Sequence, residues 1–178
     1  MRHSGRVPSA SIALCPPIPG SAATYDTEGI AAVLLADARL AAVRVLSPAM
    51  PDPESSDDER TRRAHWVAYL AVGLATSGAV APVLLVTGGA SGALSPALGF
   101  SQKAARRAVS GYVLIDAAVP PAESRGGDWP DAPVHYLASP AAEPLEVNLA
   151  RLRGWTVHDL ESIDPRVLGD VILRIAII

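Results

Sequence analysis

The segment VLLVTGGASGALSP, residues 83–96, decides the fold that the sequence predicts. It begins with aliphatic residues, breaks at residues with almost no side chain, and continues with an apolar helical pattern from Ala93 and Leu94. A strand that turns into a helix through glycines lets a ligand approach the backbone closely. The start of the helix also directs unpaired N–H groups and the positive end of its dipole at that ligand. We therefore expect a ligand site at this turn.

Strand patterns alternate with helical patterns on both sides of this segment. We expect strands over residues 10–15, 42–46, 83–86, 111–115, 134–138 and 155–160. We expect helices over residues 27–40, 56–78, 93–107, 141–153 and from residue 164 onward, with Thr27 as an N-cap and a capping box of Ser56 and Glu59. The alternation predicts an α/β fold, a three-layer sandwich in which helices flank a mostly parallel sheet of about six strands.

The composition of the chain narrows the classes of protein to which it can belong. The 178 residues are 49% hydrophobic and 4% aromatic, with a net charge of −3, so they carry no basic surface for nucleic acid. Cys15 is the only cysteine, which excludes an internal disulfide and a thiolate zinc cluster. No apolar run has the length of a membrane span or of a signal peptide. We expect a cytoplasmic protein without a membrane anchor, a cofactor or a metal, with residues 1–8 as a flexible lead-in and residues 9–178 as a single domain.

The letters VTGGASGAL resemble the glycine fingerprint of short-chain dehydrogenases. In that family the fingerprint follows the first strand, whereas two strand–helix units precede it here. Ala93 and Leu94 replace the last glycine, and no Tyr-x-x-x-Lys motif follows Tyr112 or Tyr136. These three differences favour a different family.

Over residues 10–175 the chain resembles small bacterial proteins of the α/β-hydrolase superfamily. The resemblance rests on the order of several segments: CPPIPG, the strand–turn–helix with Pro96, GYVLIDAAVP, DWPDAPVHYL, LRGWTVHDL and a closing helix that starts with Asp-Pro. It implies a truncated fold that begins at the third strand of the full version and lacks the lid domain. It also implies a nucleophile elbow, a sharp strand-to-helix turn with a nucleophile at its tip.

Aligned with the family pattern, Gly89 stands at the position of the nucleophile and Gly88 just before it. The triad would then be degenerate. A register shifted by two residues gives GASGA, residues 89–93, which is close to G-x-S-x-G and places Ser91 at the tip. Ser91 would then lie inside the helix, where a serine also serves as a cap, and capping is the interpretation that we prefer.

The other catalytic roles have one candidate each. Asp116 follows the fourth strand, a position of the acid in some members, although an aspartate there also stabilises a loop. The resemblance implies a histidine at residues 161–163, where the chain has none, so His158 within the last strand is the candidate base. We expect His65 and His135 to be structural. Cys15 is either a substitute nucleophile or a small buried side chain.

The backbone of the turn retains a possible oxyanion site. The N–H of Ala90 and an N–H from residues 17–20 can bind a carbonyl oxygen without any nucleophile. The residues that we expect to contact a small-molecule substrate are Cys15, Pro17, Ile18, Gly88, Gly89 and Ala90.

Three functions remain open from the sequence. The first is a non-hydrolytic enzyme that cyclises, eliminates or isomerises a small, largely apolar, carbonyl-bearing metabolite, as in bacterial secondary metabolism. The second is a serine hydrolase or esterase that uses Ser91, Asp116 and His158. The third is a non-catalytic binding protein, for which the apolar end VILRIAII, residues 171–178, is a possible homo-oligomer contact.

Overall fold

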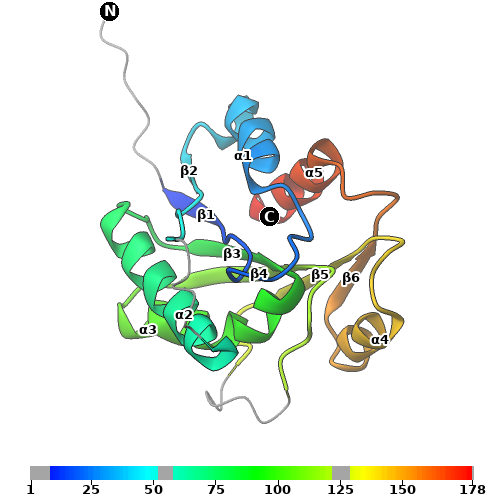
Figure 1. Ribbon diagram of the computed structural model, residues 1–178. Coiled ribbons are helices and arrows are strands. Elements are labelled where there is room, and N and C mark those ends of the chain that lie inside the picture. The colour runs from blue at the N-terminus through cyan, green and yellow to red at the C-terminus, as the bar shows by residue number, and fades with distance from the viewer. Residues whose placement is uncertain (1–8, 52–57, 122–128, 178) are drawn as a thin grey trace, which may run out of the picture.

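The computed structural model describes residues 9–51, 58–121 and 129–177. Six strands in this part of the chain form a sheet of order β2-β1-β3-β4-β5-β6, and every neighbouring pair is parallel (Figure 1). The strands are β1 (Ala10–Leu14), β2 (Val43–Leu46), β3 (Val83–Gly88), β4 (Val109–Ile115), β5 (Val134–Ala138) and β6 (Thr156–Asp159). The helices are α1 (Thr27–Ala36), α2 (Glu59–Thr76), α3 (Ser95–Ala104), α4 (Pro144–Leu152) and α5 (Pro165–Ala176), with short 3₁₀-helices η1 (Ala38–Leu40) and η2 (Gly89–Leu94).

Helices cover both faces of the sheet. Helices α1 and α5 lie on one face, and α2, α3 and α4 lie on the other (Figure 1). Strand β3 is buried throughout; Leu84 and Val86 face α1 and α5, while Val83 and Leu85 face the opposite layer. A strand covered on both faces needs a continuous apolar run, which explains the sequence of β3. The predicted three-layer α/β fold is confirmed.

Some predicted helix boundaries are wrong by a few residues. The side chain of Asp26, not Thr27, caps α1 by accepting a hydrogen bond from the N–H of Gly29, and the α-helix ends at Ala36. Asp58 caps α2, while Ser56 lies outside the described residues. The helix expected from residue 93 begins as the 3₁₀-helix η2 and becomes α-helical at Ser95, with Pro96 in its first turn. Proline is tolerated there because the missing N–H has no partner in a helix start.

The topology places the end of β3 beside the loop that follows β1. The chain passes from β1 to its neighbour β2 on one side and then crosses to β3 on the other side. In open parallel sheets, ligands bind at the carboxyl ends of the strands where the order reverses in this way.

In the described ranges, no helix has both the length and the apolar character that a membrane span requires.

Candidate functional site

The turn after β3, where the family resemblance predicts a nucleophile elbow, passes from the strand into η2 through Gly88 and Gly89. Gly89 has a φ of +54°, in the left-handed region where a side chain is strained. A Cβ atom on Gly89 would lie 2.9 Å from Cγ2 of Thr24, and one on Gly88 would lie 2.5 Å from Oγ1 of the same threonine. Thr24 therefore lies over the place that a nucleophile would take. No reactive side chain stands at the tip.

Ser91 lies in η2, two residues beyond the tip. It is 1% exposed, and its hydroxyl donates to the carbonyl of Gly88 at 2.7 Å and accepts from the N–H of Gly88 at 3.2 Å. Both bonds join Ser91, in the first turn of η2, to Gly88, the N-cap residue that precedes this helix, as in a capping interaction. The hydroxyl thus bonds with the backbone of the turn.

The loop between β1 and α1 lies beside the turn, on the side of β3 away from β4. Tyr25 is buried, and its hydroxyl donates to the carbonyl of Cys15, with the carbonyl of Val86 at 3.4 Å. This side chain joins the ends of β1 and β3 beside the elbow. Of the expected substrate contacts in this loop, Cys15 and Ile18 are buried in the core, and Pro17 is partly exposed.

The thiol of Cys15 is held in its neutral form. The residue has no exposed surface, and burial raises the pKa of its thiol to about 12. Its Sγ lies 3.7 Å from the carbonyl oxygen of Ala13. Because the thiolate is the nucleophilic form, the burial of Cys15 opposes a role as a substitute nucleophile.

Asp116 follows β4 and joins it to the end of β5. Its carboxylate accepts the N–H of Ser139 at 2.8 Å and the hydroxyl of the same serine at 2.5 Å. Asp116 has a φ of +42°, a conformation that aspartate and asparagine tolerate better than most residues. The next residues pack on the elbow, since the N–H of Ala118 donates to the carbonyl of Gly89 at 2.9 Å. Asp116 thereby shapes the loop that borders the site.

His158 pairs with a second histidine across the two last strands. Nε2 of His158 lies 3.1 Å from Nδ1 of His135, and the rings stack with centroids 5.3 Å apart. Burial lowers the pKa of both imidazoles, assisted by the neighbouring His158 at His135 and by Arg174 of α5 at His158. This geometry fits a hydrogen bond between two neutral rings, in which one imidazole donates its N–H to the unprotonated nitrogen of the other. His135 alternates with Val134 and Tyr136, which belong to the α2–α4 layer, so the pair faces α5.

Each member of the candidate triad therefore has a different hydrogen-bond partner in the described part of the chain. Ser91 bonds Gly88, Asp116 bonds Ser139, and His158 bonds His135. What remains at the elbow is backbone and one hydroxyl. Ala90, which follows the tip, is exposed, and Gly89 is partly exposed. Among the described residues, the hydroxyl of Thr24 donates one long hydrogen bond, of 3.4 Å, to the carbonyl of Ile115. Hydrogen-bond donors of this kind can polarise a carbonyl oxygen.

Two of these residues, Thr24 and Tyr25, were not among the residues predicted from the sequence. They lie between the Pro/Gly loop and the cap of α1, and no motif marks them. Tyr25 is one of four tyrosines in a chain with 4% aromatic residues, which is the single signal that points to it.

At the other end of the chain, the apolar residues Leu168, Val171 and Ile172 of α5 are buried, whereas Ile177 is 49% exposed.

Comparisons with known proteins bear on the fold. No family model matches the sequence, and no curated protein matches it. Among solved structures, the NocB thioesterase domain from the Nocardicin cluster aligns with a TM-score of 0.60 at 15% identity, over 96% of this chain and 95% of that one. The same domain has also been solved as a covalent complex with a fluorophosphonate nocardicin G analog.

Two further structures have the same architecture. The Vlm2 thioesterase domain aligns with a TM-score of 0.57 at 14% identity, over 93% of this chain and 91% of that one. A protein of Lactobacillus plantarum assigned as a carboxylesterase aligns with a TM-score of 0.56 at 10% identity, over 100% and 90% of the two chains. Identities this low establish the fold alone. The described part of the chain therefore has an α/β-hydrolase-like fold, with a sheet of six parallel strands.

Proposed function

We propose that the protein is a non-hydrolytic enzyme that binds a small, largely apolar, carbonyl-bearing molecule at the elbow. The observation that carries the proposal is Gly89, which has the backbone conformation of an elbow tip and lies under the methyl group of Thr24. Acyl transfer through a covalent intermediate needs a nucleophile and a base at this point. The site instead offers the N–H of Ala90, the donors of the loop after β1 and the hydroxyl of Thr24.

These donors stabilise negative charge that develops on a carbonyl oxygen. In an intramolecular addition to an enone, the substrate supplies its own nucleophile: its hydroxyl oxygen bonds the β-carbon while the C=C electron pair shifts to form an enolate, and the hydroxyl proton passes through water to the α-carbon. This step requires neither a base of the protein nor an acyl-enzyme. Donors that are fixed by the backbone would also hold the substrate in one reactive conformation, which lowers the barrier without a charged residue. A ketone, an enone or a lactone is the class of substrate that this arrangement fits.

A screen by ligand-observed NMR tests the proposal with small ketones, enones and lactones. We expect members of this set to bind the wild-type chain and not Gly89→Trp, in which an indole fills the space beside Ala90. Ala97→Trp is the matched control, because Ala97 is exposed on α3 and accepts the same side chain outside the site. Equal binding by Gly89→Trp would contradict the proposal. Binding without conversion of any ligand would favour the non-catalytic alternative.

A serine hydrolase or esterase that uses Ser91, Asp116 and His158 is the second candidate. It is favoured by the fold, which the chain shares with proteins named as thioesterases and a carboxylesterase. It would require the hydroxyl of Ser91 to leave Gly88 and His158 to leave His135. A fluorophosphonate probe with intact-mass analysis separates the two candidates. We expect no adduct, and a stoichiometric adduct at Ser91 would establish the hydrolase.

A further inference from the structure

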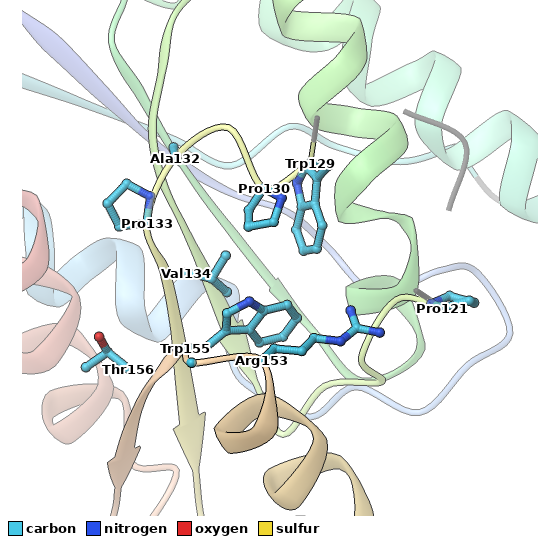
Figure 2. A pocket seen from close by; sticks show the side chains of 10 residues that line it. Pro121, Trp129, Pro130, Ala132, Pro133, Val134, Arg153, Trp155 and Thr156 are labelled. Atoms are coloured by element: carbon cyan, nitrogen blue, oxygen red, sulfur yellow. The ribbon is translucent and has the colours of Figure 1, made fainter. Parts of the chain in front are cut away.

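A cavity of about 500 Å³ lies at the amino ends of β5 and β6, at the end of the sheet away from the elbow. Val134 and Thr156 in its lining are the first residues of β5 and β6, whereas Asp116 and Ser139 follow the carboxyl ends of their strands. The remaining wall comes from the segment before β5 and from the turn between α4 and β6, which bring together Trp129, Pro130, Arg153 and Trp155 (Figure 2). This volume suits a small molecule with one or two rings.

Two indole rings with a fixed mutual orientation form the apolar part of the cavity. Trp129 meets Trp155 edge to face, with centroids 5.7 Å apart and planes at 89°. Trp129 also meets Tyr112 at 5.3 Å, and the hydroxyl of Tyr112 donates to the carboxylate of Asp131 at 2.7 Å. Aromatic contacts of this geometry stabilise the orientation of each ring. Two of the three tryptophans of the chain therefore line one cavity as preformed flat walls.

Arg153 supplies the charge at this site. Its Cζ lies 5.3 Å from the centroid of the Trp155 ring, and Figure 2 shows its side chain alongside that ring. Within the described residues the guanidinium makes no ion pair, whereas Arg151, two residues earlier, pairs with Asp159 at 3.2 Å. A guanidinium held against an aromatic face still has its in-plane N–H groups available for a carboxylate.

We propose that this cavity binds a planar aromatic carboxylate. The ring system contacts Trp129 and Trp155, and the carboxylate accepts hydrogen bonds from the guanidinium of Arg153. The site is separate from the elbow, so its ligand is distinct from the carbonyl compound proposed there.

The test uses 2-naphthoate and the three indole N–H signals of the ¹⁵N-labelled full chain, assigned with single Trp→Phe variants. We expect 2-naphthoate to shift the signals of Trp129 and Trp155 and to leave that of Trp66 unchanged. Trp66 is fully buried and donates to the carbonyl of Pro16 at 2.9 Å, so it is an internal reference for the fold. Failure of both cavity signals to shift at a probe concentration on the order of millimolar would overturn the proposal.

Charge recognition is tested by comparing two arginines of the same region. We expect Arg153→Gln to weaken the binding of 2-naphthoate by about tenfold while changing that of the uncharged 2-acetylnaphthalene little. Arg153→Lys should retain part of the affinity, and the control Arg151→Gln should leave both affinities unchanged. An equal loss in Arg151→Gln, or no loss in Arg153→Gln, would contradict the assignment of the carboxylate to Arg153.

Discussion

Asp116 and Ser139 connect the carboxyl ends of two neighbouring strands through both oxygens of one carboxylate. The N–H of Ser139 reaches Oδ1 at 2.8 Å, and its hydroxyl reaches Oδ2 at 2.5 Å. Hydrogen bonds to a charged acceptor are stronger than those between neutral groups. The pair thus holds the loop after β4 against the elbow, where the N–H of Ala118 meets Gly89.

Replacement of Asp116 should destabilise the protein. We expect Asp116→Ala to lower the free energy of unfolding by about 2–3 kcal/mol, because it removes the acceptor of two hydrogen bonds and places alanine at a positive φ. Asp116→Asn keeps an acceptor and tolerates this backbone, so its loss should be about 1 kcal/mol. Urea denaturation measures both values. Equal stabilities of the alanine variant and the wild type would refute the structural role of the carboxylate.

The histidine pair should make stability depend on pH. Both imidazoles have a folded-state pKa below the ordinary value of 6.5, so the unfolded chain binds protons more readily than the folded one. The contribution of the pair is complete above pH 6.5 and is lost as the pH falls through the lowered values. We expect the unfolding midpoint in urea to decrease between about pH 7 and about pH 5.

His158→Gln provides the comparison for this effect, because it removes one titrating ring and keeps a polar side chain. We expect the fall in stability below about pH 6.5 to be smaller in this variant than in the wild type. His65→Gln, on helix α2, is the control and should follow the wild type. Identical pH profiles for the wild type and His158→Gln would show that the pair does not titrate as described.

Insertion of a serine at the tip should not create a hydrolase. In the double variant Gly89→Ser with Thr24→Ala, the second change removes the methyl group that a Cβ would meet at 2.9 Å. The new hydroxyl would still lack a base, because His158 bonds His135 on the face of the sheet toward α5. We expect neither a fluorophosphonate adduct nor turnover of p-nitrophenyl butyrate above the wild-type level. Efficient labelling of the double variant would indicate that a base reaches the elbow.

The thiol of Cys15 should resist alkylation in the native state. Burial raises the pKa of the thiol to about 12, so the reactive thiolate is scarce near neutral pH, and the residue has no exposed surface. We expect iodoacetamide to modify the unfolded chain in urea within minutes and the native chain far more slowly, as followed by intact mass. The reagent-accessible unfolded sample serves as the control. Comparable rates in the two states would mean that Cys15 is accessible at the elbow.

The fold was predictable because each element carries its own local pattern. The apolar run of β3 needs only its own residues to indicate a strand covered on both faces, and Asp164 with Pro165 marks the start of α5. The exact residues at which the helices begin and end were less predictable. Asp26 and Thr27 are both acceptable caps, and the choice between them depends on how the preceding loop reaches the helix.

The site was predictable where the backbone determines it and not where side chains from distant segments meet. Positive φ at the elbow tip follows from the pair Gly88-Gly89 in a strand-to-helix turn. The position of Thr24 over Gly89 depends on the path of the loop after β1, which no local pattern specifies. The pairing of His135 with His158 likewise depends on the register between β5 and β6.

Tyr25 has a consequence for how a molecule reaches the elbow. Its hydroxyl is held by the carbonyl of Cys15 and lies close to that of Val86, so the backbone next to Thr24 is anchored to two strands of the sheet. Movement of this loop away from the sheet would break the buried hydrogen bond of Tyr25, so the loop is not expected to open for a ligand. The exposed edge of the site is at Ala90. For the binding that we propose, Ala90 is therefore the side of the turn that is open to solvent.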